Sequence, residues 1–118
     1  MSGISCHVLD TARGRPAAGL AVRLERWTEA NGELGSGWQI ASRSQTNADG
    51  RALGLEGSAG VLPGSYRLSF ETAAYLRREG HPVFYPEVQV LFVVEAGEAR
   101  YHIPLLLSPF GYSTYRGS

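Results

Sequence analysis

Two histidines and an arginine are the best candidates for acid–base and anion chemistry in this sequence. His7 and His102 each lie in a segment whose polarity alternates as in a strand, and an imidazole exchanges protons near neutral pH. Arg51 follows an Asp-Gly turn signal, and its guanidinium offers a fork of donors to an anion or a carbonyl oxygen. Ordinary explanations compete: strand histidines are often half-buried with a hydrogen-bond partner, and an arginine after a turn is often solvated. The third histidine, His81, lies in a Gly-His-Pro turn and is expected at the surface.

Cys6 directly precedes His7, but this pair does not predict a thiol nucleophile. Successive side chains on a strand point to opposite faces, so the thiol and the imidazole are not expected to meet. A small apolar core residue is the better interpretation of Cys6. The sequence also has no Cys and His spacing typical of zinc sites, no glycine-rich phosphate loop and no nucleophile elbow.

The segment 112–118 is polar and strand-like, and it holds two tyrosines and an arginine. Terminal residues usually fray, whereas phenol and guanidinium groups give this tail the means to dock. Composition alone leaves a docked tail and a free tail equally open.

Length and composition describe one folded unit without a strong electrostatic bias. The chain has 118 residues, 43% of them hydrophobic and 19% charged, with a formal net charge of zero. This predicts a single domain over residues 1–118 and gives no argument for nucleic acid or an anionic membrane as a partner. No apolar run approaches the ~20 residues of a membrane span. No signal peptide is visible near Met1, and one cysteine cannot form an internal disulfide, so we expect a cytoplasmic protein.

The elements that must position these residues are mostly strands. Turn signals recur along the whole chain, a rhythm typical of many short strands. Alternation predicts strands over 4–9, 20–27, 38–46, 65–70, 88–94, 101–107 and 112–116. Segment 72–79 has good helix formers, with Thr72 as a plausible N-cap and Gly80 as a stop. Pro104 favours an edge strand or a bulge. The predicted fold class is all-β: a two-sheet antiparallel β-sandwich of about eight strands with one short helix.

Five motifs, in order along nearly the whole chain, resemble one family. They are Cys6-His7-Val8-Leu9-Asp10-Thr11 with the following Gly14-Arg15-Pro16-Ala17, Thr46-Asn47-Ala48-Asp49-Gly50-Arg51, Tyr85-Pro86-Glu87-Val88, the run from His102 to Pro109, and Tyr115-Arg116-Gly117-Ser118. Together they resemble the transthyretin-like (prealbumin-like) family of 5-hydroxyisourate hydrolases. The terminal Tyr-Arg-Gly-Ser is the most specific of them, because it separates these hydrolases from the hormone-carrying transthyretins.

The resemblance implies a fold, an assembly and a reaction. The fold is two packed sheets with one short helix, and the assembly is a homotetramer, a dimer of dimers, with active sites in the channel between the dimers. The reaction opens the lactam ring of 5-hydroxyisourate, an unstable product of urate oxidation in purine catabolism. Water attacks a ring carbonyl, and the product is 2-oxo-4-hydroxy-4-carboxy-5-ureidoimidazoline. Neither an organic cofactor nor a catalytic metal is implied.

The resemblance also implies two sets of site residues. The catalytic set is His7, Arg51, His102 and Ser118, and the substrate-binding set is Tyr115, Arg116 and Gly117. The two histidines would activate water and deliver a proton, in an order that the sequence leaves open, and the arginine would stabilise the developing oxyanion. A docked tail would bring Ser118 and its terminal carboxylate beside the histidines.

The chain departs from the family pattern at a few positions. Cys6 stands where a small hydroxyl residue is expected before the histidine, and Arg100 stands where many members have another histidine. The segment 32–44 is long, which predicts an enlarged turn.

Two other functions compete with hydrolysis. A transthyretin-like carrier of small aromatic hormones would be expected to line its channel with apolar residues instead of histidines and arginine. A purely structural or adhesive sandwich domain is the second alternative, and the expected absence of a signal peptide and of flanking domains argues against it.

Overall fold

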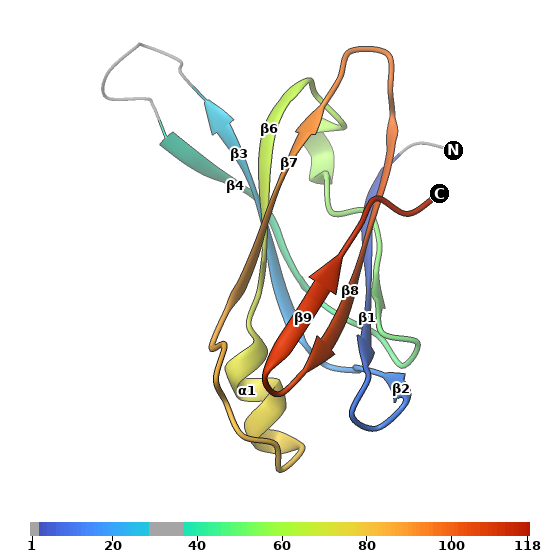
Figure 1. The fold of residues 1–118 in the computed structure, drawn as a ribbon. Helices are drawn as coiled ribbons and strands as arrows, with labels where there is room; N and C mark the ends of the chain where they lie inside the picture. Colours follow the sequence, from blue (N-terminus) through green and yellow to red (C-terminus); the bar gives the residue numbers. More distant parts are fainter. Residues whose placement is uncertain (1–2, 29–36) are drawn as a thin grey trace.

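The computed structural model describes residues 3–28 and 37–118, which form two facing β-sheets (Figure 1). In the first sheet the order is β2-β1-β8-β9, and β5 also pairs with β1; the strands are β1 Gly3–Asp10, β2 Arg15–Pro16, β5 Arg51–Ala52, β8 Arg100–Ser108 and β9 Gly111–Thr114. In the second sheet the order is β4-β3-β6-β7, with β3 Ala21–Thr28, β4 Gly37–Gln45, β6 Gly64–Phe70 and β7 Val88–Val94. The predicted two-sheet sandwich is confirmed. The enlarged turn predicted over 32–44 lies in part outside the described residues, and its remainder, from residue 37 on, belongs to β4.

Strand β1 supplies the core with one face and leaves the other face open. Its residues alternate between buried and half-buried, so that Ile4, Cys6 and Val8 are fully buried against the second sheet. The prediction that Cys6 is a core residue is confirmed, and burial raises the pKa of its thiol to about 12. A thiol with so high a pKa is not a nucleophile near neutral pH. Ser5 and His7 lie on the opposite, outer face.

The pairing of β1 with β8 is parallel, whereas the sequence predicted antiparallel strands throughout. The ladder runs from Gly3 opposite Arg100 to Asp10 opposite Leu107. It joins two strands at opposite ends of the sequence and makes β8 an interior strand between β1 and β9. The expectation that Pro104 marks an edge strand or a bulge is therefore wrong.

Pro104 interrupts the regular pairing of β8 with the neighbouring strand β9. Strand β9 ends at Thr114, which pairs with Leu105, and an isolated bridge in the same register then joins His102 to Gly117. Between these two pairs lies Pro104, which has no N–H to donate to the ladder. Its carbonyl instead accepts a hydrogen bond from the Thr114 hydroxyl at 2.7 Å. The tail thus stays in register with β8 after the regular strand stops.

The α-helix α1 (Thr72–Arg78), the only one in the described ranges 3–28 and 37–118, connects β6 to β7. Gly80 follows it as the predicted stop, with its N–H donating to the carbonyl of Arg77. Thr72 is the first helical residue, whereas the N-cap position is held by Glu71. The Thr72 hydroxyl donates to the carbonyl of Tyr85, so it fastens the loop before β7. Across the described part of the chain, no helix is both long and apolar enough to cross a membrane.

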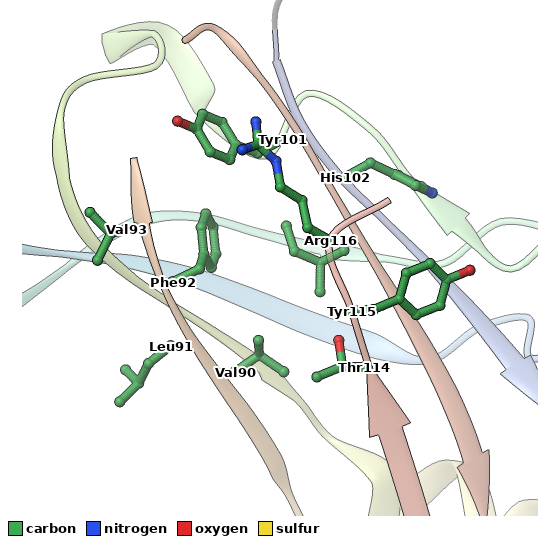
Figure 2. Close-up of a pocket in the computed structure, with 10 residues that line it drawn as sticks. Val90, Leu91, Phe92, Val93, Tyr101, His102, Thr114, Tyr115 and Arg116 are labelled. Carbon is green, nitrogen blue, oxygen red and sulfur yellow. The ribbon is translucent and has the colours of Figure 1, made fainter. Parts of the chain in front are cut away.

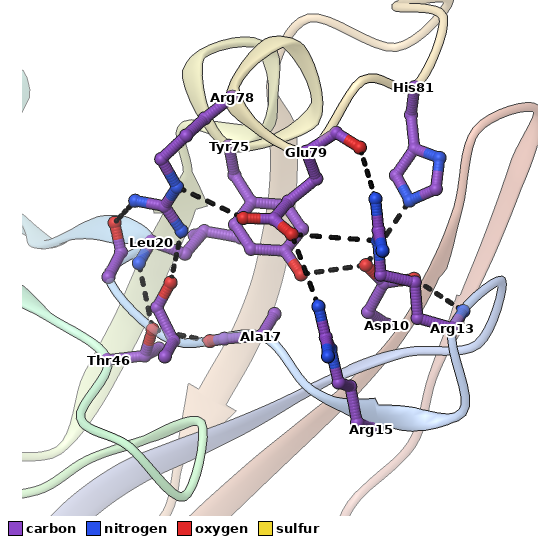
Figure 3. A network of polar contacts seen from close by, with 12 residues as sticks. Asp10, Arg13, Arg15, Ala17, Leu20, Thr46, Tyr75, Arg78, Glu79 and His81 are labelled. Carbon is purple, nitrogen blue, oxygen red and sulfur yellow. Dashed lines mark hydrogen bonds and ion pairs between the residues drawn. The ribbon is translucent and has the colours of Figure 1, made fainter.

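Beyond the helix, His81 is partly buried and joins a polar network, which corrects the expectation of a surface turn residue (Figure 3). Its Nε2 lies 3.4 Å from Oδ2 of Asp10, which also accepts a hydrogen bond from the Tyr75 hydroxyl at 2.7 Å. The Asp10 Oδ1 accepts from the backbone N–H of Arg13. Burial acts to raise the pKa of Asp10, but the hydrogen bonds from Tyr75, Arg13 and His81 together lower it. The network ties the end of α1 to β1.

Candidate active site

Three strands of the first sheet bring His7, Arg51 and His102 to its outer face. His7 is the register partner of Arg51 in the β1–β5 pair. His102 is the register partner of Ser5 in the β1–β8 pair, two residues before His7 on the same face. The two imidazole centroids lie 6.5 Å apart. Residues that are far apart in sequence therefore meet as neighbours.

The turn before β5 fixes the position of Arg51. The side-chain Oδ1 of Asn47 accepts hydrogen bonds from the backbone N–H groups of Asp49 and Arg51. Gly50 has φ 75°, a left-handed conformation that favours glycine. A Cβ at this position would lie 2.5 Å from the carbonyl oxygen of Val8. Glycine thus allows the turn to lie directly on β1. There the carbonyl of Gly50 accepts a hydrogen bond from the backbone N–H of Val8.

The tail crosses the same face because it stays in register with β8. The N–H of Gly117 donates to the carbonyl of His102 at 2.8 Å. This pairing sends Tyr115 and Gly117 to the outer face and Arg116 to the inner one, because side chains alternate along an extended chain. The tail is docked, which resolves the alternatives that composition left open.

The predicted substrate-binding residue Arg116 lies apart from the other site residues (Figure 2). Its guanidinium carbon is 4.4 Å from the centroid of the Tyr101 ring, and its Nη2 donates to the Arg100 carbonyl at 3.2 Å. It also pairs with the Glu98 carboxylate at 3.5 Å. Figure 2 shows this guanidinium over Tyr101, with the rings of His102 and Tyr115 directed away from it. All four residues border a hollow of about 250 Å³. Through its contacts with Tyr101 and Arg100, Arg116 holds the tail from the inner face of the sheet.

The remaining predicted residues line one open pocket of about 390 Å³. His7, Arg51, His102, Tyr115, Gly117 and Ser118 all contribute to it. Ser5, Leu53 and Arg100 line it as well, and the sequence had not singled out Ser5 or Leu53 as site residues. The signal for Ser5 was present, since alternation places it on the same face as His7. The described lining has two arginine side chains, no aspartate or glutamate, and one carboxylate at the end of Ser118, so the balance still favours an anion.

The surroundings of His102 in the pocket lower its pKa and so favour the neutral imidazole. Burial of the ring is the largest cause that lowers its pKa, and the charges of Arg51, His7 and Arg100 lower it further. A neutral imidazole at neutral pH can accept a proton from water. Within residues 3–28 and 37–118, no three His, Cys, Asp or Glu side chains converge as ligands of a metal ion would.

Comparisons with known proteins agree on a family but not on one activity. The family model described as HIUase/Transthyretin family matches residues 4–117. The 5-hydroxyisourate hydrolase of Mus musculus is 45% identical over 117 residues, which cover 99% of this chain and 96% of the mouse chain. The structure of Klebsiella pneumoniae 5-hydroxyisourate hydrolase has a TM-score of 0.81 at 37% identity and full coverage of both chains. Sea bream transthyretin, solved in complex with thyroxine, has a TM-score of 0.85 at 30% identity and covers 97% of this chain and 93% of its own. The fold is common to both proteins, so the residues of the pocket must distinguish the two activities.

Proposed function

The chain belongs to the HIUase/transthyretin family, and from the chemistry of its pocket we propose that it is the hydrolase of 5-hydroxyisourate in urate degradation. The observation that carries this proposal is the convergence of His7, Arg51 and His102 on one sheet face beside the docked tail. A site that only held an apolar aromatic ligand would gain nothing from two imidazoles and a guanidinium. The mouse and Klebsiella relatives carry the name of the same enzyme.

We propose that His102 activates the attacking water. Its lowered pKa leaves Nε2 or Nδ1 free to take the proton as the water oxygen bonds to a ring carbonyl carbon. The Arg51 guanidinium stabilises the oxyanion that forms. The ring C–N bond then breaks, and the departing nitrogen takes a proton from His7, which faces the same pocket and is resupplied with the proton that His102 took from the water. The water molecule thus contributes its oxygen and one hydrogen to the new carboxyl group and its other hydrogen to the freed N–H.

The tail supplies part of the lining of the proposed site. Ser118 and Tyr115 line the pocket, and their hydroxyls are available to orient the water and the substrate. Gly117 holds the tail against His102 through the backbone hydrogen bond. Arg116 acts in this proposal as the anchor of the tail and does not touch the substrate.

We further propose the assembly and setting predicted from the sequence: one domain over residues 1–118, a homotetramer, and cytoplasmic localisation. Support for the assembly comes from exposed aromatic rings beside the β8–β9 turn, where Phe84 is 60% exposed and Phe110 66% exposed. Their ring centroids lie 6.1 Å apart, so they form one apolar patch that a second copy would cover. Light scattering of the protein in solution tests the tetramer, and cell fractionation tests the localisation.

The test is the ultraviolet decay of 5-hydroxyisourate generated from urate by urate oxidase. The protein should accelerate this decay, and His7→Ala and His102→Ala should each lose about 10²-fold in kcat. His81→Ala is the matched control, because its ring contacts Asp10 outside the pocket, and it should change the rate little. If the wild-type protein leaves the decay unchanged, the proposal fails. A thyroxine-binding measurement on the same sample then tests the carrier alternative.

A further inference from the structure

Ser5 contacts a nitrogen of the proposed water-activating histidine. Its Oγ lies 2.8 Å from Nδ1 of His102, across the parallel β1–β8 ladder in which the two residues are register partners. Both side chains are half-buried on the outer face of the sheet, and both line the 390 Å³ pocket. The rigid pairing of two long strands therefore sets this distance, and no loop contributes to it.

A second contact confines the imidazole from its carbon side. The backbone of Gly117 lies so close to the ring that a Cβ there would be 2.6 Å from Cδ2 of His102. With Ser5 at Nδ1 and Gly117 at Cδ2, both edges next to the ring's attachment point are occupied. The remaining edge, which carries Nε2, is the one left for a substrate.

We propose that Ser5 is a positioning residue for the hydrolysis: its hydroxyl accepts the Nδ1 proton of His102, so that Nε2 faces the substrate with a free lone pair. This inference rests on the proposed function. A neutral imidazole carries one proton, so holding it on Nδ1 makes Nε2 the acceptor. The lowered pKa of His102 supports the neutral form on which this arrangement depends. Oriented partners of this kind typically change activity by 10–100-fold when removed, as at metal-bound histidines.

The experiment compares three serine variants by steady-state kinetics. Ser5→Ala removes the hydroxyl and should lower kcat by about 10-fold with little change in KM, because the serine acts through His102 and not on the substrate. Ser5→Thr keeps the hydroxyl and should restore most of kcat. Ser108→Ala is the matched control, because its hydroxyl bonds to the carbonyl of Gly111 in the β8–β9 turn, and it should retain full activity.

A substrate-free measurement separates this inference from the proposed function. The ¹⁵N chemical shifts of His102 should report a proton on Nδ1 in the wild type and a shift toward the Nε2-protonated form in Ser5→Ala. Identical shifts in the two proteins, a proton on Nε2 in the wild type, or an unchanged kcat in Ser5→Ala would each overturn the inference. A wild type that does not hydrolyse 5-hydroxyisourate would refute the proposed function, while the nitrogen shifts would still decide the role of Ser5.

Discussion

Replacing Gly117 with alanine tests whether activity requires the close contact between the tail and the ring of His102, the proposed activator of water. The added Cβ would be 2.6 Å from Cδ2 of His102 and 3.2 Å from Cγ of Pro104. Carbon atoms in contact prefer about 3.5–4.0 Å, so the tail or the ring has to move by about 1 Å. A displacement of this size in an active site can cost on the order of 10²-fold in rate. We therefore expect Gly117→Ala to lose about 10²-fold in kcat/KM for 5-hydroxyisourate.

Stability should respond much less than activity. The tail residues Tyr115 and Arg116 are exposed and add little to the core, so we expect the Tm to change by no more than a few degrees. The assay is the ultraviolet decay of 5-hydroxyisourate, with thermal unfolding followed on the same samples.

Gly111→Ala is the matched control within the same strand pair. Its Cβ would lie 3.7 Å from the Ser108 hydroxyl, an ordinary contact, and neither this glycine nor Gly117 has a left-handed backbone. It should keep nearly full activity. The reasoning is refuted if Gly117→Ala retains half of the wild-type kcat/KM, or if both variants lose activity equally.

Three further substitutions test other contacts. Arg116→Ala removes the anchor over Tyr101 and should lower kcat/KM by about 10-fold with little loss of stability, whereas Arg116→Lys should fall between; a fully active alanine variant would show that the tail needs no anchor. Arg100→Gln removes a positive charge that lowers the pKa of His102, so the acidic limb of the pH–rate profile should move to higher pH; an unmoved or lower limb contradicts this electrostatic role. Asp10→Asn should destabilise the fold by about 1–3 kcal/mol in urea unfolding at pH 7. Because the folded pKa of Asp10 is lowered, its carboxylate stabilises above the unfolded pKa and this stabilisation is lost as the pH falls through the folded pKa. The difference in free energy of unfolding between Asp10→Asn and the wild type should therefore be smaller in acid than at pH 7. An equal difference under the two conditions would argue against an ionised Asp10.

The sequence predicted the long elements well, because alternation is a local signal. Alternation along residues 4–9 put Cys6 and His7 on opposite faces of the predicted strand. In β1, Cys6 is buried and His7 is half-buried on the outer face. The two-residue strands β2 and β5 are too short for any period, so the pairing of Arg51 with His7 did not follow from the pattern. It follows from the turn geometry and from the fit of Gly50 against β1.

The errors came from contacts between distant segments. His81 is held by Asp10, which is 71 residues away in the sequence, and no local pattern signals that contact. Nor does a local pattern show that the β8 register turns Arg116 to the face opposite Tyr115 and Gly117; its assignment to the substrate-binding set stays a prediction. That register also continues past Pro104, which the sequence had indicated as an edge or a bulge.

The parallel β1–β8 ladder bears on how the protein gains activity as it folds. Ser5 and His102 are 97 residues apart in the sequence, so the pairing of their strands closes a loop that contains the whole second sheet. Closing so large a loop is entropically costly, so such pairings tend to form slowly. During refolding from denaturant, tryptophan fluorescence reports on Trp27 and Trp38, which pair across the local β3–β4 hairpin. We expect the fluorescence signal to recover first and catalysis to return in a later phase. The recovery of enzyme activity would then report the formation of the β1–β8 pairing as a late step of folding.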